Sequence, residues 1–157
     1  MKLRLICVGK LAEAWQRQAA DDYAGRLQHY FPFEVCELKE EKGGRKGDIP
    51  GLLKREGERI LEKIPQQSFL IVLDERGRSL GSEQLAEQLA VEMLHGGRDW
   101  CLVIGGPYGL DPAVKQRADL LLSLSKMTFT HQMARLFLLE QLYRCSTILR
   151  NEPYHNR

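Results

Sequence analysis

The sequence predicts an α/β fold, in which a mainly parallel sheet carries helices on both faces. Short apolar runs alternate with longer segments of helical periodicity along the whole chain, which is the order expected when each strand is followed by a helix. Parallel strands need such crossover helices, and the helices cover both faces of the sheet. The chain has 157 residues, 43% hydrophobic and 28% charged, without an internal repeat or a linker. We therefore expect one domain over residues 1–157.

The N-terminal part of the chain predicts two strands and one helix. An apolar run over residues 3–8 ends at Gly9 and predicts the first strand, and residues 33–38 predict the second. Between them, apolar residues spaced four apart predict a helix over residues 11–30. These residues are Trp15, Ala19, Tyr23 and Leu27.

The segment 39–48 contains three glycines, mixed charge and no apolar side chain, which predicts an irregular loop. Lys42, Arg45 and Lys46 cluster in this segment and are candidate RNA contacts. A solvated loop without any partner explains the same residues equally well.

The middle of the chain predicts a helix, a strand and a second helix. Pro50 predicts a helix start, because the first turn of a helix tolerates its missing N–H, and an apolar stripe continues to Ile64. Residues 69–73 predict the third strand, which we expect to stop at Asp74. Ser82 is the expected N-cap of the next helix.

The last third predicts two strands and two helices. Residues 100–104 predict the fourth strand and residues 120–124 the fifth. Between these strands, Asp111 followed by Pro112 predicts a short capped helix. A long helix over residues 132–149 then leads into a polar tail.

Composition narrows the class of protein. The formal net charge is only +2, which permits a nucleic-acid partner without requiring one. The four cysteines are scattered without metal-ligand spacing, so we expect free thiols, a reducing cytosol and no metal site. The apolar start is too short for a signal peptide, and no run approaches the roughly 18 residues that span a bilayer. We expect a cytoplasmic protein without a membrane partner.

Two segments place small or hydroxyl residues where a buried strand should end. One is the glycine turn Gly105-Gly106-Pro107-Tyr108-Gly109, and the other is the serine- and threonine-rich stretch 122–131. Ligands bind at the carboxyl ends of strands in open α/β sheets, and glycine lets them approach the main chain. The turn matches neither a dinucleotide fingerprint nor a phosphate loop. A tight turn and a polar connector explain the two segments at least as well as a ligand site does.

The last helix and the tail suggest a partner subunit and a nucleic-acid substrate. The helix is apolar nearly all round, and a small monomer has little room to bury it on every side, so we infer a homodimer. Arg135 and Arg144 on this helix are candidate contacts to phosphate or a base edge, although an ion pair with Glu140 also explains Arg144. Most C-termini are inert. Tyr154 and His155 nevertheless offer a stacking ring beside a titratable group, which suits a flipped base.

Four segments together resemble the motifs of the RlmH family of SPOUT-class ribosomal RNA methyltransferases, and the resemblance covers the whole chain. They are residues 70–74, 103–110, 122–133 and 153–155. Thr130 departs from the pattern, since some relatives have proline there. The resemblance implies a trefoil knot near the C-terminus, which sequence patterns would not suggest. It also implies a homodimer, S-adenosylmethionine as methyl donor, and methylation of N3 of a pseudouridine in 23S rRNA.

Carried over by position, the resemblance implies a cofactor site and a catalytic tail. The cofactor residues are Leu73, Gly105, Leu124, Ser125, Lys126, Met127, Thr128 and Phe129. The tail would reach toward the partner subunit's cofactor, where Tyr154 packs the base and His155 assists proton removal or orients the base. The alternative is a non-catalytic dimeric factor that binds RNA or the ribosome. It would explain the basic residues and the apolar helix, but not two ligand-like strand ends.

Overall fold

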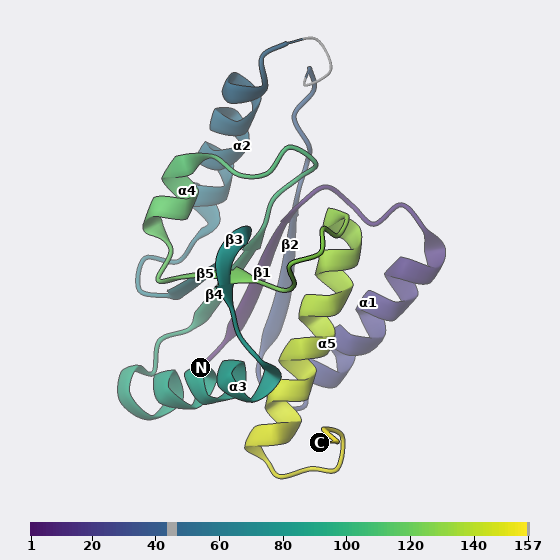
Figure 1. Ribbon diagram of the computed structural model, residues 1–157, viewed down its shortest axis with the longest axis vertical. Coiled ribbons are helices and arrows are strands. Elements are labelled where there is room, and N and C mark those ends of the chain that lie inside the picture. The colour runs from purple at the N-terminus through teal and green to yellow at the C-terminus, as the bar shows by residue number, and fades with distance from the viewer. Residues whose placement is uncertain (44–46, 157) are drawn as a thin grey trace.

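The computed structural model describes residues 1–43 and 47–156, and it confirms the parallel α/β sheet (Figure 1). Five strands lie in the order β2-β1-β4-β3-β5, and each neighbouring pair is parallel. Their bounds are β1 Leu3–Val8, β2 Phe33–Leu38, β3 Phe69–Ser79, β4 Trp100–Ile104 and β5 Leu120–Ser123.

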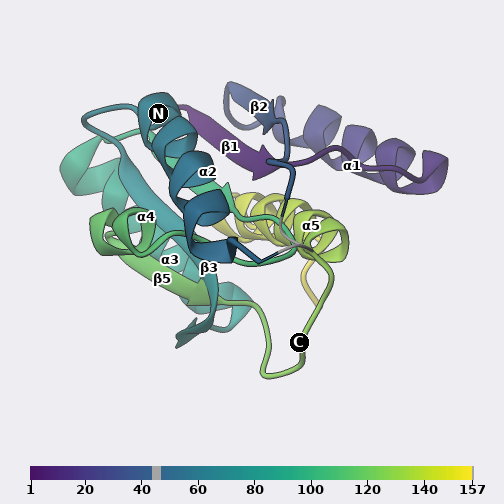
Figure 2. The same cartoon turned by 90° about the horizontal axis from the view of Figure 1, so that it is seen from above.

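Helices cover both faces of this sheet. They are α1 Ala14–Leu27, α2 Ile49–Lys63, α3 Ser82–Val91 with the π-helical turn Glu92–Gly96, α4 Pro112–Arg117 and α5 His131–Leu149. On one face α5 contacts both α1 and α3, and on the other face α2 contacts α4 (Figures 1 and 2). Among the described residues, no helix combines the length and the apolar character that a membrane span requires.

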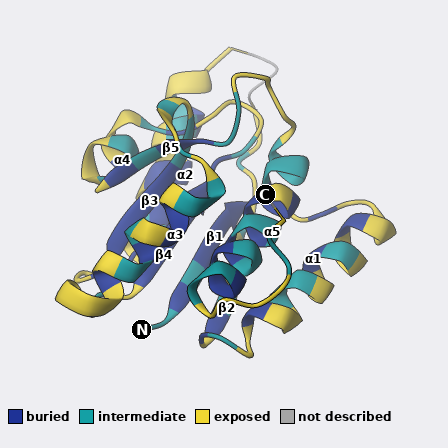
Figure 3. Cartoon of the chain, turned by 60° about the horizontal axis from the view of Figure 1, so that its bottom comes forward, coloured by how far each residue is buried: buried dark blue, intermediate teal, exposed yellow. Residues whose placement is uncertain are grey.

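Two apolar cores lie on the two faces, and the central strands belong to both. Every residue of β4 is buried, and Trp100 at its start stacks on Phe69 with ring centroids 5.7 Å apart. Figure 3 shows β1, β4 and the first half of β3 buried, with exposed residues on the outer sides of the helices. The burial explains why these runs are apolar in the sequence.

The third strand is longer than predicted. β3 does not stop at Asp74 but continues to Ser79, and its register against β5 shifts between Leu73 and Arg78. The strand can continue because Gly77 packs directly on the β5 backbone, where a Cβ would lie 2.6 Å from the carbonyl carbon of Leu121. The polar residues 74–77, which look like a strand end in the sequence, form an irregularity inside the strand.

Several helix ends also differ from the predictions. Ser82 is the first residue of α3 and not its N-cap: Gly81 holds that position and donates its N–H to Gln84 Oε1 at 2.8 Å. The first helix is confined to Ala14–Leu27, and α5 begins one residue earlier than predicted, at His131. The cap predicted at Asp111 is confirmed, because its carboxylate accepts the Ala113 N–H at 2.8 Å.

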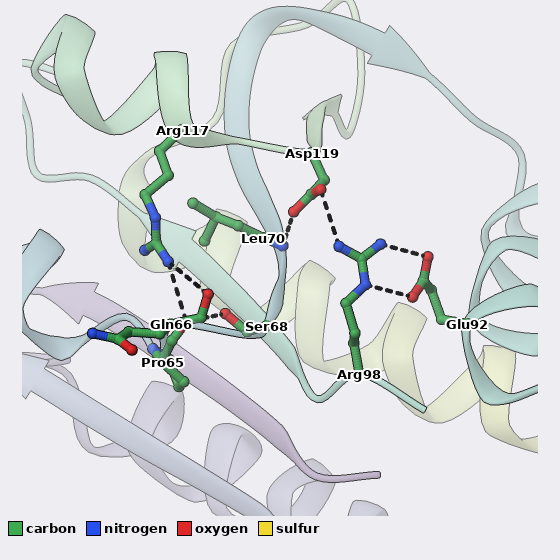
Figure 4. A network of polar contacts seen from close by, with 8 residues as sticks. All are labelled: Pro65, Gln66, Ser68, Leu70, Glu92, Arg98, Arg117 and Asp119. Atoms are coloured by element: carbon green, nitrogen blue, oxygen red, sulfur yellow. Dashed lines mark hydrogen bonds and ion pairs between the residues drawn. The ribbon is translucent and has the colours of Figure 1, made fainter. Parts of the chain in front are cut away.

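A network of polar contacts lies at the end of the sheet where β3, β4 and β5 begin (Figure 4). Arg98 donates to both carboxylate oxygens of Glu92, at 2.9 and 3.0 Å, and to Asp119 at 3.3 Å. Asp119 in turn accepts the N–H of Leu70 at 2.8 Å. On the α4 side, Arg117 donates to the carbonyl of Pro65 at 3.2 Å. The opposite end of the sheet, where these strands end, is the place where open α/β sheets usually bind ligands.

Candidate active site

A pocket of about 960 Å³ lies where β3, β4 and β5 end. Seven of the eight residues that the sequence suggested for a cofactor line this pocket, and the exposed Lys126 does not. The seven are Leu73, Gly105, Leu124, Ser125, Met127, Thr128 and Phe129. The glycine turn and the serine-rich stretch are therefore two walls of one pocket, as their positions at strand ends suggested.

The glycine turn is shaped by its own backbone. Gly106 and Gly109 form an isolated bridge, in which the Gly109 N–H donates to the Gly106 carbonyl at 3.1 Å. A Cβ on Gly105 would lie 2.6 Å from the Gly109 oxygen and 2.7 Å from Leu110 Cγ. Glycine is thus required at position 105 by the turn itself, and the turn then presents main-chain groups to the pocket.

The second wall holds its shape through its hydroxyl groups. Ser123 donates to the carbonyl of Ser125 at 2.9 Å, and the Ser125 hydroxyl accepts the Met127 N–H at 3.0 Å. Thr130 caps α5 by accepting the Met133 N–H at 3.2 Å. These hydroxyls satisfy backbone groups of an irregular loop, so the loop reaches the pocket in one defined shape.

One ion pair lies in the pocket lining and was missed by sequence reasoning. Lys115 of α4 lies 2.6 Å from the Asp74 carboxylate, whose side chain is only 8% exposed. Burial raises the pKa of Asp74, but the hydrogen bonds from Lys115 and from the Arg76 N–H outweigh it, so the pKa lies below its usual value. Asp74 was interpreted only as a strand end, and nothing in the spacing connects it with Lys115.

His131 forms the part of the pocket wall where α5 begins. Its Nε2 atom is buried and has no hydrogen-bond partner in the described part of the chain, and the Glu40 carboxylate lies 3.7 Å away. Burial lowers the pKa of His131, Arg135 lowers it further, and Glu40 partly offsets both. Nothing in the sequence pattern connects His131 with Glu40.

A family model described as "Predicted SPOUT methyltransferase" matches residues 1–155. The chain is 59% identical over its full length to the ribosomal RNA large subunit methyltransferase H of Syntrophotalea carbinolica, and it covers 100% of that protein. The proteins of the same name from Pelobacter propionicus and Geotalea uraniireducens are 49% and 46% identical over 99% of this chain and 100% of theirs. The chain belongs to the SPOUT methyltransferase family.

A solved structure agrees with this SPOUT methyltransferase fold. A probable methylase family protein from Haemophilus influenzae Rd KW20 aligns with a TM-score of 0.55 and 13% identity. The alignment covers 99% of this chain and 70% of the other. At this identity the likeness concerns the fold alone.

The tail of this SPOUT methyltransferase chain lies away from its own pocket. Tyr154 packs on α5, with its hydroxyl 3.0 Å from Glu140 and its ring 4.7 Å from that of Tyr143. His155 lies beside Arg144 at 3.4 Å and beside Glu83 at 3.6 Å. Glu140 follows His131 by nine residues, which is about 13 Å along a helix axis. The structure therefore does not bring the suggested catalytic pair to the cofactor wall of the same chain.

The two arginines suggested as RNA contacts have protein partners. Arg135 is 4% exposed, and it donates to Glu37 at 2.6 Å and to the Gly9 carbonyl at 2.8 Å. Arg144 forms the ion pair with Glu140 that the spacing had offered as the alternative, and it lies 4.8 Å above the Tyr154 ring. Their contacts to RNA stay predictions.

The basic loop is described only in part. Lys42 is exposed, and Arg45 and Lys46 lie outside the described residues. Their suggested RNA contacts stay predictions too.

Proposed function

We propose that this protein is an rRNA methyltransferase that transfers a methyl group from S-adenosylmethionine to N3 of a pseudouridine in 23S rRNA. The observation that carries this proposal is the 59% identity, over the complete length of both chains, to a protein named ribosomal RNA large subunit methyltransferase H. The pocket supports it, because it collects the residues that the RlmH resemblance assigns to the cofactor.

The pocket fits S-adenosylmethionine in size and in chemistry. Its volume of about 960 Å³ lies at the upper end of the range usual for small-molecule sites. The Gly105 turn offers main-chain groups for an adenine edge, and Met127 and Phe129 offer apolar surface for its ring. Asp74 and Lys115 supply one charge of each sign for a ligand that carries an ammonium, a carboxylate and a sulfonium. The sulfonium supplies the methyl group, and the chain's task is to hold it in line with N3.

We further infer a homodimer in which each tail serves the other subunit's pocket. Phe129 and Phe137 are in ring contact at 4.8 Å, and 37% and 41% of their surfaces are exposed. Met127 beside them is 76% exposed. Apolar surface gathered at a pocket mouth is typical of a subunit interface. A partner would bring Tyr154 and His155 to a pocket that they do not reach in their own chain, where they orient the base or assist proton removal.

Three further features belong to the proposal. The C-terminal part, from β4 to α5, forms a trefoil knot, as the SPOUT family implies. The chain acts as one domain over residues 1–157. It works in the cytoplasm, where its rRNA substrate is found, within the ribosome or its large subunit.

A methyl-transfer assay tests the proposed function. The purified protein is incubated with radiolabelled S-adenosylmethionine and with ribosomes, large subunits or isolated 23S rRNA from cells that lack the modification. We expect label at N3 of one pseudouridine, detected by nuclease digestion and mass spectrometry. Binding of RNA or ribosomes without methyl transfer would favour the non-catalytic RNA-binding factor instead.

Deletion of Tyr154 to Arg157 tests the role of the tail. We expect cofactor affinity to stay unchanged in calorimetry while methyl transfer is lost. Unchanged turnover in this variant would refute the role of the tail and leave the pocket assignment intact.

A further inference from the structure

The wall of the pocket formed by the start of α5 carries a histidine that the proposed function has not used. The side chain of His131 is 17% exposed, although its Nε2 atom is completely buried. Because Nε2 is buried, Nδ1 is the ring nitrogen left to contact a ligand in the pocket that His131 lines. A proton acceptor at this position would face a ligand bound in the pocket.

A carboxylate lies behind the buried edge of the ring. Glu40 Oε1 is 3.7 Å from Nε2, which is longer than a normal hydrogen bond of about 2.7–3.2 Å. Catalytic hydrogen bonds are often long in the free enzyme and tighten when the substrate binds. A proton on Nε2 directed at Glu40 would leave the Nδ1 lone pair free toward the pocket.

A buried arginine holds this arrangement in place. Arg135 lies one turn after His131 on α5 and donates to Glu37 of β2 and to the Gly9 carbonyl after β1. These bonds connect the start of α5 to the segment that carries Glu40. The charged groups that act on the imidazole are therefore Glu40 from the segment after β2 and Arg135 from α5 itself.

We propose that His131 is the proton acceptor of the methyl transfer, with Glu40 as its positioning residue. This inference rests on the proposed function. The carbon–sulfur bond of the sulfonium breaks with its electrons left on sulfur, and the methyl carbon bonds to N3 of the pseudouridine. The N3 proton moves to Nδ1 of His131, and the imidazolium that forms is paired with the Glu40 carboxylate. Charge is conserved, because the sulfonium's positive charge is replaced by that of the imidazolium.

The ionisation behaviour of His131 agrees with this role. Burial lowers the pKa of His131 and so favours the neutral ring, which is the form that can accept a proton. Tyr154 and His155 of the partner subunit then serve to orient the base, which is one of the two roles proposed for them above.

The first test uses the protein without cofactor or RNA. Nitrogen NMR of the imidazoles should show His131 neutral, with its proton on Nε2 and a bare Nδ1. The Glu40→Gln variant should shift the Nε2 signal more than the Nδ1 signal. A proton found on Nδ1 in the free wild-type protein would overturn the inference, whatever the activity.

The second test separates chemistry from binding. For His131→Asn we expect S-adenosylhomocysteine affinity within about threefold of wild type, and single-turnover methyl transfer about 10²-fold or more slower. His131→Ala should recover part of its rate in proportion to added imidazole and should lose the acidic limb of the pH–rate profile. The exposed His95→Asn is the matched control and should behave as wild type.

The outcomes distinguish the inference from the function on which it rests. A wild-type rate in His131→Asn, or an acidic limb that disappears in His155→Asn and persists in His131→Ala, would overturn the role of His131 alone. Absence of methyl transfer by the wild-type protein would overturn the proposed function and this inference together.

Discussion

At Gly105, the atoms that exclude a side chain belong to the glycine turn itself. A Cβ there would meet the Gly109 carbonyl oxygen and Leu110, and a backbone carbonyl cannot move aside as a flexible side chain can. We expect Gly105→Ala to lower stability by about 1–3 kcal/mol and to weaken cofactor binding with it, because the wall of the pocket is deformed. Thermal unfolding and calorimetry measure the two effects.

Gly109→Ala is the matched control for Gly105. No atom lies within 4 Å of a Cβ at this position, but its φ of +89° strains an L-residue. Only that strain should remain, at about 1–2 kcal/mol. If Gly105→Ala kept full stability and lost only cofactor affinity, the steric contact would be with the ligand and not with the turn.

Glu56 is a buried carboxylate whose ionisation opposes folding. It is 5% exposed and accepts the Glu41 N–H at 3.0 Å. Burial raises its pKa and outweighs the lowering by the Glu41 N–H and by Arg59, and the charges of Glu40 and Glu41 raise it further. The folded protein thus holds this proton to higher pH than the unfolded chain does, so stability falls as pH rises through the range just above the usual carboxyl pKa.

Glu56→Gln should therefore raise the melting temperature near neutral pH and leave it unchanged at about pH 3.5, where the carboxyl is protonated in both states. The amide oxygen can still accept the Glu41 N–H. Glu58→Gln, on an exposed position of the same helix, should change neither value. An equal gain at both pH values would show that charge is not the cause.

Sequence reasoning at the residue scale identified seven residues that line the pocket, but not the charged groups of its lining. The two walls could be predicted because each is a short stretch of glycine or hydroxyl residues that directly follows an apolar run in the sequence. Asp74 with Lys115, and His131 with Glu40, meet only in the folded chain. The acidic residues carried no pattern of their own, so nothing singled them out.

Gly25 of α1 and Gly57 of α2 have different surroundings. Gly25 lies in α1, where a Cβ would have no atom within 4 Å, whereas a Cβ on Gly57 of α2 would lie 2.7 Å from Asp111 Cβ. Gly25→Ala should raise stability by about 0.5–1 kcal/mol, through the better helix propensity of alanine. That corresponds to a few degrees in melting temperature at about 2–4 °C per kcal/mol. Gly57→Ala should lower it, because α2 and α4 would be pushed apart.

A fall in the melting temperature of Gly25→Ala would contradict this interpretation of α1. The comparison also shows that sequence cannot rank such glycines. Both lie in regular helical patterns, and only the approach of α4 makes one of them necessary.

Strand and helix types could be predicted, whereas some of their ends could not. All five strands lie where the apolar runs are, because a strand covered on both faces must be apolar. The polar residues 74–77 misplaced the end of β3, since a register shift accommodates them while Gly77 keeps β3 beside β5. Ser82 was wrong as an N-cap because Gly81 together with Gln84 satisfies the helix start, and the Ser82 hydroxyl donates to Gln141 of α5 instead.

At the scale of the whole molecule, the separation of tail and pocket leads to a test of the homodimer. Mixing a subunit that lacks Tyr154 to Arg157 with a Gly105→Val subunit, whose larger side chain should abolish cofactor binding, pairs an intact pocket with an intact tail. If tails act across the interface, two inactive proteins refolded together should recover about a quarter of the wild-type rate, since half the dimers are mixed and each has one working site.

Light scattering measures whether the protein is a dimer, and methyl transfer to rRNA measures the recovery. Each variant refolded alone provides the baseline. If the mixed protein is a dimer but recovers no methyl transfer, each tail acts in the pocket of its own chain, and the proposed action across the interface is wrong.

The whole-molecule features were the least accessible to pattern reasoning. The sheet class followed from the alternation of elements, but the strand order β2-β1-β4-β3-β5 did not. The trefoil knot that we propose rests on the family resemblance alone, because threading of a chain leaves no periodicity in the sequence. The last helix looked apolar on all sides, yet most of it is covered within the chain by α1, α3 and the sheet. The helix pattern alone is therefore weaker support for a dimer than the exposed rings at the pocket mouth.

The pairing of β1 with β4 also governs how the chain can be made. Leu3 is in register with Trp100, so the first strand to leave the ribosome must wait for nearly two thirds of the polypeptide before its central neighbour exists. Until then, β2 is the only native neighbour with which β1 can pair. The other hydrogen-bonding side of β1, which β4 covers in the folded protein, stays available for aggregation or for a chaperone. Contacts of such long sequence separation also make folding slow once synthesis is complete. A methyltransferase of rRNA thus depends, for its own central strand, on the late stages of translation.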